Sequence, residues 1–330
     1  MAPLTWSTFF GTWELQPVWL AAVILVGGGY FVLWRRSAGS TVGTWRAVCF
    51  LAGLALTWVV VASAIAIYAL SIFWMHMVMH LLLIMVVPAL LVLGHPLTVL
   101  VEGVEPGRSE RLRSLIASRP IGMLTHPLSG LVIYGTVVMG THLSDFLDQV
   151  ATQGWLVWGE QVLYLGSGFL FLLPLLGEEP LRRNPPYLIR LIILMAAGGP
   201  DTLVGVVLLQ TNTVLYPKMM GAHPSWAPSA ITDLHIGGAM MWAGGDGLMM
   251  AIAVALMITV VTSPTRQRRM TGGWLEDVRR AAMAGQIAQS GASGADTEAP
   301  GATPADTLDP DSDEAWEAYN RMLARLRERE

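Results

Sequence analysis

Residues 74–96 read WMHMVMHLLLIMVVPALLVLGHP, an apolar stretch long enough to enter a bilayer as a helix, and it contains two histidines near its start. His76 and His80 are four residues apart, so on a helix their side chains lie one above the other on a single face. An imidazole in hydrocarbon is costly unless a metal or a hydrogen-bond partner satisfies it. The stretch therefore predicts a membrane helix that carries the beginning of a polar site, and our leading hypothesis is a metal site near the outer membrane surface.

The composition indicates a polytopic membrane protein. Of the 330 residues, 53% are hydrophobic and 13% are charged, and the mean hydropathy is +0.52. These values exclude an ordinary pair of soluble domains. The net charge of −4 indicates no nucleic-acid partner, and the single cysteine, Cys49, leaves neither an intrachain disulfide nor a cysteine-based metal site.

Seven segments are long and apolar enough to cross a bilayer as helices of about 20 residues. They are 17–34, 46–70, 73–101, 127–143, 155–176, 188–210 and 236–262. Pro88 and the run Gly94-His95-Pro96 lie inside the third segment and predict a kink there. The predicted fold is an all-α polytopic membrane protein with seven transmembrane helices.

Arginines predict the orientation of these helices. They follow the first, third, fifth and seventh segments, which share one side of the membrane if the helices alternate: Arg35, Arg36, Arg46, Arg108, Arg111, Arg113, Arg119, Arg182, Arg183, Arg190, Arg266, Arg268 and Arg269. The other side carries only Lys218. By the positive-inside rule the N-terminus is outside and the C-terminus is cytoplasmic, and we expect a multi-pass protein of the plasma membrane.

The chain divides into an outer N-terminal segment, residues 1–16, a membrane domain, residues 17–262, and a cytoplasmic tail, residues 263–330. The first segment lacks a basic n-region and a clear cleavage site, so we expect no removable signal peptide. Within the tail we expect a short amphipathic helix, a disordered stretch and a terminal helix, in that order, at 271–280, 285–312 and 313–330. The terminal helix could dock onto a partner or be a solvated tail with no partner, and the sequence favours neither role over the other.

Orientation gives each polar residue an approximate depth, and six of them fall in the outer half or near the midplane. These candidate metal-site residues are His76, His80, His235, Glu160, Asp201 and Asp246. Polar side chains within spans usually face the bundle interior, so they are expected to converge. Asp201 and Asp246 could equally orient the imidazoles from behind. A hydrogen-bonded histidine pair, satisfied by Glu160 or Asp201, is the alternative to a metal.

Copper is the predicted metal because methionines crowd the same outer half, and imidazole together with thioether suits Cu(I). Most of these methionines are nevertheless expected to be packing residues. His142 and His223 are expected at the membrane interface rather than in the ligand set, and His126 is expected to begin the fourth helix.

Soluble catalytic motifs are absent from the sequence: there is no P-loop, no GxSxG and no HExxH, because position 77 is Met. We therefore expect no enzyme. Three other functions stay open: a transporter of copper or another small solute, a haem-binding membrane protein and a metal-free scaffold. A transporter would need polar residues through both leaflets, and here the inner half is nearly bare of them.

Four motifs resemble those of the polytopic CtaG-like cytochrome c oxidase assembly factors. Residues 76–94, HMVMHLLLIMVVPALLVLG, resemble the family pattern HxxxHxLLxxxxxPLLxLG, and 233–246, DLHIGGAMMWAGGD, resemble its GGxxMWxxG(E/D) element. LTHP at 124–127, and LVGV at 203–206 followed by LYP at 215–217, agree more weakly. The likeness covers roughly residues 17–265.

The resemblance implies seven membrane helices and a role in building the terminal oxidase of aerobic respiration, with copper insertion at the outer face and oxidase subunits as partners. The matching positions that carry over are His76, His80, Asp233, Trp242 and Asp246. The chain departs from the pattern elsewhere. The fifth helix begins WGEQVLY at 158–164 where many members are histidine-rich, Asp201 stands where many have histidine, and His235 stands at a position that is often polar but not histidine.

Overall fold

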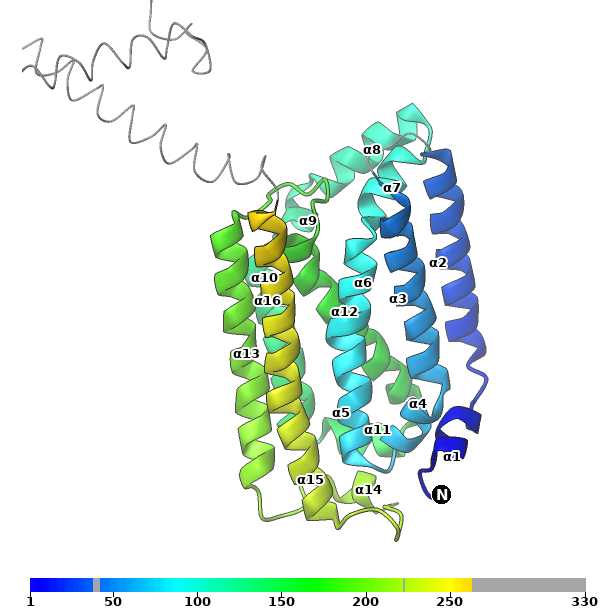
Figure 1. Cartoon of the computed structure of the whole chain (residues 1–330), viewed down its shortest axis with the longest axis vertical. Helices are drawn as coiled ribbons and strands as arrows, with labels where there is room; N and C mark the ends of the chain where they lie inside the picture. The colour runs from blue at the N-terminus through cyan, green and yellow to red at the C-terminus, as the bar shows by residue number, and fades with distance from the viewer. Residues whose placement is uncertain (38–41, 222, 263–330) are drawn as a thin grey trace, which may run out of the picture. The chain divides into compact units, whose positions relative to one another are not determined.

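The structure is a computed structural model that describes residues 1–37, 42–221 and 223–262. The three predictions for the tail, at 271–280, 285–312 and 313–330, lie outside these residues. Within them the chain is a bundle of helices without a β-strand (Figure 1), which confirms the predicted all-α fold. The elements are α1 (Trp6–Gly11), α2 (Pro17–Arg36), α3 (Thr44–Ala62), α4 (Ala64–Ala69), α5 (Phe73–Leu81), the π-helix η1 (Leu82–Val86), α6 (Val87–Leu93), α7 (Pro96–Glu102), α8 (Pro106–Ile116), α9 (Arg119–Leu124), α10 (Pro127–His142), α11 (Phe146–Thr152), α12 (Gly154–Leu176), α13 (Tyr187–Gln210), α14 (Pro217–Met220), α15 (Ala230–Ala239), the π-helix η2 (Met240–Gly244) and α16 (Gly245–Val261).

Six helical segments of the described chain are long and apolar enough to cross a membrane. A seventh forms if α10 and α11 are counted as one span, which bends by 66° between them. These segments match the seven predicted ones in order and approximate position. The bend explains why the fourth predicted segment is short, because α11 turns aside instead of extending α10.

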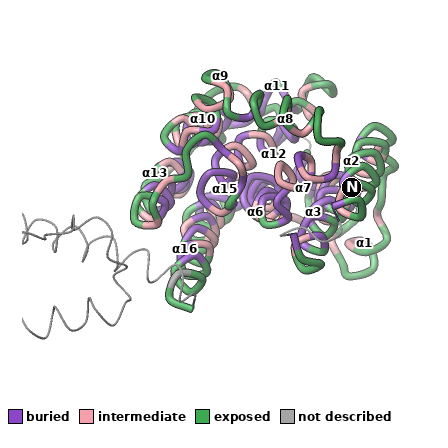
Figure 2. Tube along the Cα trace, turned by 90° about the horizontal axis from the view of Figure 1, so that it is seen from above, coloured by how far each residue is buried: buried purple, intermediate pink, exposed green. Residues whose placement is uncertain are grey.

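The third span, Phe73–Glu102, lies at the centre of the bundle. Two thirds (67%) of its most apolar window is buried, against 17% for α2, so α2 is peripheral. Figure 2 shows the same arrangement, with buried residues concentrated on α6, α12 and α15 and exposed ones on α1, α2 and the far side of α16. The quoted histidine stretch is therefore the element that the other helices surround.

Pro88 and the π-helix η1 before it shape the third span. Because proline has no N–H, Pro88 cannot donate the α-helical hydrogen bond to the carbonyl of Ile84 four residues earlier. Gly168 of α12 faces this carbonyl so closely that a Cβ there would meet the Ile84 oxygen. The predicted break at Gly94-His95-Pro96 is also present: His95 adopts the left-handed conformation (φ 52°) between α6 and α7.

The prediction of one continuous helix over residues 46–70 is wrong, because two helices, α3 and α4, occupy this segment. Ser63 between α3 and α4 is extended, caps α4 through a hydrogen bond from the Ile65 amide, and pairs in an isolated β-bridge with Trp13. Ser favours caps over helix interiors, and the N-terminal segment supplies the backbone partner that stabilises the break.

Among the described residues, the arginine-bearing helices α8 and α9 lie at one end of the bundle, whereas α1, α11 and α14 lie at the other end (Figure 1). The start of α5, with its histidines, is at the end of α11 and α14. Which end faces the cytoplasm stays a prediction from the charges.

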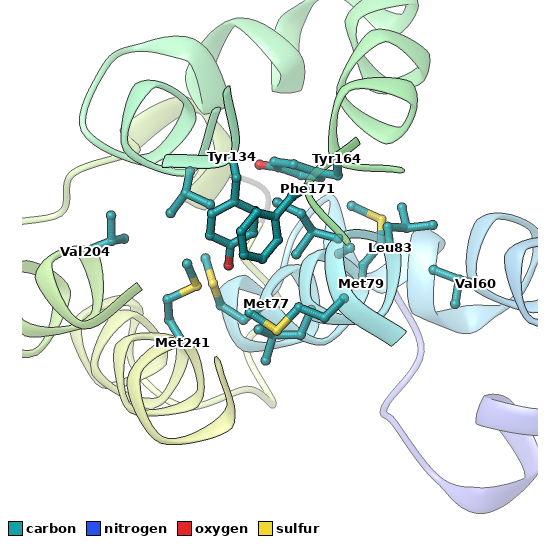
Figure 3. Close-up of a cluster of buried hydrophobic side chains, with 14 of the residues drawn as sticks. Val60, Met77, Met79, Leu83, Tyr134, Tyr164, Phe171, Val204 and Met241 are labelled. Atoms are coloured by element: carbon teal, nitrogen blue, oxygen red, sulfur yellow. The ribbon is translucent and has the colours of Figure 1, made fainter. Parts of the chain in front are cut away.

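The buried core runs through the middle of the bundle and is rich in methionine and aromatic residues. Figure 3 shows Met77, Met79 and Met241 packed among side chains that include Tyr134 and Phe171, all at most 3% exposed. Most of the outer-half methionines therefore have the packing role that the sequence favoured for them.

Candidate functional site: a buried histidine cluster

Two helices bring three buried histidines together. His76 and His80 come from α5, and His142 is the last residue of α10. The ring centroids of His80 and His142 are 4.9 Å apart, and those of His76 and His142 are 5.9 Å apart. All three side chains are at most 3% exposed. His142 is thus buried beside the pair of histidines from α5, which the sequence did not predict.

The local hydrogen bonds of His142 fix its tautomer. Its Nδ1 lies 2.9 Å from the carbonyl oxygen of Val138, which can only accept, so Nδ1 carries the proton. The Thr141 hydroxyl, also 2.9 Å from Nδ1, donates to the Val137 carbonyl and is free to accept. Nε2 of His142 therefore presents a lone pair, and no hydrogen-bond partner within the described residues occupies it.

The other two histidines also have unpartnered nitrogens. In the described part of the chain, Nε2 of His76 and both ring nitrogens of His80 have no hydrogen-bond partner. The nearest acid, Glu160, places Oε1 3.7 Å from Nε2 of His76, too far for a hydrogen bond. Asp201 instead accepts a hydrogen bond from the Tyr134 hydroxyl, away from the histidines. Neither acid therefore satisfies the histidine pair in the way the alternative hypothesis required.

Glu160 and Tyr164 lie one turn apart on α12 and form the wall of the cluster. The Tyr164 hydroxyl donates to Oε1 of Glu160 at 3.1 Å, and the Tyr164 ring stands edge-on to His80 with centroids 4.4 Å apart. Both side chains are at most 1% exposed. Sequence reasoning gave Glu160 a role but missed Tyr164, although its i+4 spacing from Glu160 places it on the same face.

Two contacts outside the cluster hold its helices in place. The Asp233 carboxylate of α15 accepts hydrogen bonds from the amides of Phe73 (2.7 Å) and Trp74 (2.9 Å), which caps the first turn of α5. Nε2 of His223 lies 3.1 Å from the same carboxylate. The resemblance transferred Asp233 without a role, and the structure identifies it as a residue that positions α5.

Tyr216, in the connection between α13 and α14, holds the end of α10. Its hydroxyl donates to the backbone carbonyl of His142 at 2.5 Å. Burial raises the pKa of Tyr216, and the nearby Asp148 carboxylate adds to this, so the hydroxyl stays protonated as a donor.

The remaining predicted site residues lie apart from the cluster. Asp201 accepts from the Tyr134 hydroxyl at 2.7 Å, and Asp246 accepts from the Thr202 hydroxyl at 2.8 Å. Nε2 of His235 lies 2.9 Å from the carbonyl of Thr211 in the loop after α13. Each of these three residues has a hydrogen-bond partner of its own, although Oδ1 of Asp201 and of Asp246 has none among the described residues. None of the three has a contact with the histidine rings among the described interactions.

The chemistry of the donor set fits a soft or borderline metal ion. Three imidazoles with unoccupied nitrogens lie together with one carboxylate and one phenol in the buried cluster. Among the described residues, however, no three His, Cys, Asp or Glu side chains are already placed to share one ion. The rings would have to turn to close around a metal, which suits a site of passage better than a permanent structural site.

Comparison with known families gives this geometry a context. A sequence model described as the cytochrome c oxidase caa3 assembly factor matches residues 28–263. The chain belongs to this family. The match begins partway along α2 and includes the whole of α16, so it covers every helix of the cluster. Membership of the family confirms the resemblance found in the sequence motifs.

Curated relatives of this chain include uncharacterized proteins from mycobacteria. An uncharacterized protein of Mycobacterium leprae is 29% identical over 260 residues, covering 76% of this chain and 39% of that protein. One from Mycobacterium bovis is 28% identical over 290 residues, covering 80% of this chain and 43% of that protein. The chain thus spans about two fifths of the length of these curated relatives. No solved structure matches the chain.

Proposed function

We propose that this member of the family assists assembly of cytochrome c oxidase, and that it binds Cu(I) on His76, His80 and His142 and passes it on to the oxidase at the outer face of the plasma membrane. The observation that carries the proposal is the set of unpartnered nitrogens in this buried cluster. Buried polar groups are nearly always hydrogen-bonded, so three imidazoles that each keep at least one unpartnered nitrogen favour a ligand that completes them.

Copper is here the cargo rather than a resident cofactor. Neutral imidazoles are good ligands for copper, and a dry surrounding of methionine and aromatic side chains suits the monovalent ion because it costs less to dehydrate than a divalent one. Glu160 supplies a carboxylate beside His76, and Tyr164 orients it. Asp201, Asp246 and His235, which the sequence also nominated, have no part in this arrangement and serve the proposal as controls.

The direct test is the copper content of the purified protein. Wild type in detergent is loaded with Cu(I) under anaerobic conditions, desalted and analysed by atomic absorption. We expect one Cu(I) per chain, and its loss in His142→Ala and in the double variant His76→Ala/His80→Ala. His235→Ala is the matched control, a histidine of the same bundle that bonds a backbone carbonyl, and it should retain the metal. Equal copper in all four proteins would reject the ligand set.

A metal-free scaffold that holds oxidase subunits is the second candidate. It is favoured by the finding that no three potential ligands in the described residues are already placed to share an ion. The two candidates differ in a cell that lacks this gene. A scaffold would restore oxidase activity with the His142→Ala variant, whereas a copper-passing protein would restore it only with wild type or His235→Ala.

A further inference from the structure

One surface pocket reaches the histidine cluster. It lies between α4, α5, α11, α12 and α14, and His76 and Glu160 line it. Leu70 and Ala151, which are exposed to the surroundings, line it as well. Its volume of about 10 Å³ is close to what one water molecule occupies. The pocket therefore connects the buried cluster with the surface at the end of the bundle that carries α11 and α14.

Two methionines line this pocket, Met79 from α5 and Met219 from α14. Both are buried, at 3% and 4% exposure. Met79 follows His76 by three residues and so lies on the same face of α5. Thioethers bind Cu(I) well and bind hard cations such as Mg²⁺ poorly, so the lining selects for soft ions before the histidines are reached.

The wall that carries Met219 is fixed by hydrogen bonds. Oδ1 of Asp148 on α11 accepts from the amides of Lys218 (3.0 Å) and Met219 (3.3 Å), which ties the short helix α14 to α11. Asp148 is itself buried. Helix α11 also contributes Ala151 to the lining of the pocket, so α11 both holds α14 in place and forms the opening.

We infer that this pocket is the entrance by which Cu(I) reaches the cluster, moving from Met219 and Met79 to His76. The inference rests on the proposed function and adds to it the route and the origin of selectivity. Each step is an exchange of ligands: a bond from copper to a thioether sulfur breaks as a bond to an imidazole nitrogen forms, and the ion stays Cu(I) throughout. The donor is any outer-surface carrier of Cu(I) whose ligands are weaker than the cluster.

The first test needs no copper. In a Cys49→Ala background, which removes the native thiol, Met79→Cys and Met77→Cys are treated with a small cationic methanethiosulfonate reagent. Met77 is fully buried and does not line the pocket, so we expect Met79→Cys to react and Met77→Cys to stay unmodified. Adding Ala151→Trp should slow the reaction about tenfold or more, because opening a filled passage raises the barrier. Gln149→Trp, an exposed change on the same helix, should leave it unaltered.

The second test uses Cu(I) itself. Its rate of loading is measured by stopped flow with a Cu(I)-specific chelator in wild type, Ala151→Trp and Gln149→Trp, each checked for folding by size exclusion. We expect Ala151→Trp to load about tenfold more slowly and to reach the same final copper content. Leu70→Trp closes the pocket from the opposite wall and serves if Ala151→Trp does not fold.

The outcomes separate the two proposals. Wild type that binds no Cu(I) overturns the proposed function, and this route for Cu(I) with it. Wild type that binds Cu(I) at the same rate as both pocket-filling variants leaves the proposed function in place and overturns the entrance alone. A Met79→Cys thiol that never reacts, or that reacts equally with tryptophan at position 151, also overturns the entrance.

Discussion

The Asp233 carboxylate of α15, which caps the start of α5, and the histidine cluster, which begins one turn later on α5, are equally buried. They differ in whether their polar atoms are satisfied. The Asp233 carboxylate has three hydrogen-bonding neighbours, the amides of Phe73 and Trp74 and the ring of His223. The cluster leaves nitrogens of all three of its histidines without a partner among the described residues. The first arrangement is complete without any ligand, whereas the second is completed only by one.

The difference predicts opposite responses to substitution. Removing a saturated carboxylate leaves buried donors unpaired and destabilises the fold. Replacing an unpartnered imidazole by an apolar side chain of similar size removes a desolvation cost and loses no hydrogen bond. A structural polar group and a ligand-binding one can thus be told apart by comparing stability with function, even where exposure is the same.

The largest expected effect on stability is that of Asp233→Ala. The change leaves two buried backbone N–H groups at the start of α5 unpaired, at a cost of roughly 2–4 kcal/mol in the free energy of unfolding. The measurement is unfolding in mixed detergent and SDS micelles. Asp145→Ala is the control, an exposed acid at the N-cap position of α11 that makes no side-chain capping bond. A wild-type-like Asp233→Ala would remove the distinction between the two sites.

Gly168→Ala tests the framework that carries Glu160 and Tyr164. An added Cβ would collide with the Ile84 carbonyl, so α12 must move away from η1, at a cost of about 1–3 kcal/mol or more. Gly166→Ala on the same helix meets nothing within 4 Å and should be neutral or slightly stabilising. If both variants unfold alike, the close approach of the two helices contributes nothing to stability.

Much of this framework follows from the sequence. Hydropathy predicts the spans, the i, i+4 spacing puts His76 and His80 on one face, and His126 begins α10 as expected, its Nδ1 accepting from the Leu128 amide. These features depend on residues close together in the chain. The family resemblance is carried by two such local patterns, around His76 and around Asp246.

The composition of the cluster could not be predicted in the same way. His142 sits at the end of a short span, where sequence places a residue at the interface, and it is buried because it packs against His76, His80 and Tyr164 of α5 and α12. His235 shares the predicted depth of the pair but meets the Thr211 carbonyl instead. Depth along the membrane normal is readable from sequence, whereas rotation about a helix axis and the path of a loop are set by distant contacts.

His80→Leu tests the comparison most directly, because it should change the stability of the protein little and abolish its function. Neither nitrogen of His80 has a partner in the described structure, so the free energy of unfolding should stay constant or rise by up to about 1 kcal/mol. Copper binding and oxidase assembly should both be lost. The measurements are the unfolding titration and the copper analysis on one preparation. A destabilisation comparable to that of Asp233→Ala would mean that His80 has a structural partner.

The smallest expected effect concerns Glu179, a second saturated carboxylate, in the connection between α12 and α13. It is 1% exposed and accepts from the amides of Leu97 and Thr98 and from the Thr98 hydroxyl. Burial nevertheless raises its pKa, with these hydrogen bonds opposing the shift. Because the folded-state pKa is raised, the contribution of Glu179 to stability is full below the ordinary pKa of glutamate, and it is lost as the pH rises through the raised value.

Unfolding followed between about pH 5 and pH 8 should therefore show wild type losing stability relative to Glu179→Gln as the pH rises. The exposed neighbour, changed as Glu178→Gln, should track wild type. A pH-independent difference for Glu179→Gln would show that the hydrogen bonds outweigh burial and that Glu179 behaves as Asp233 does.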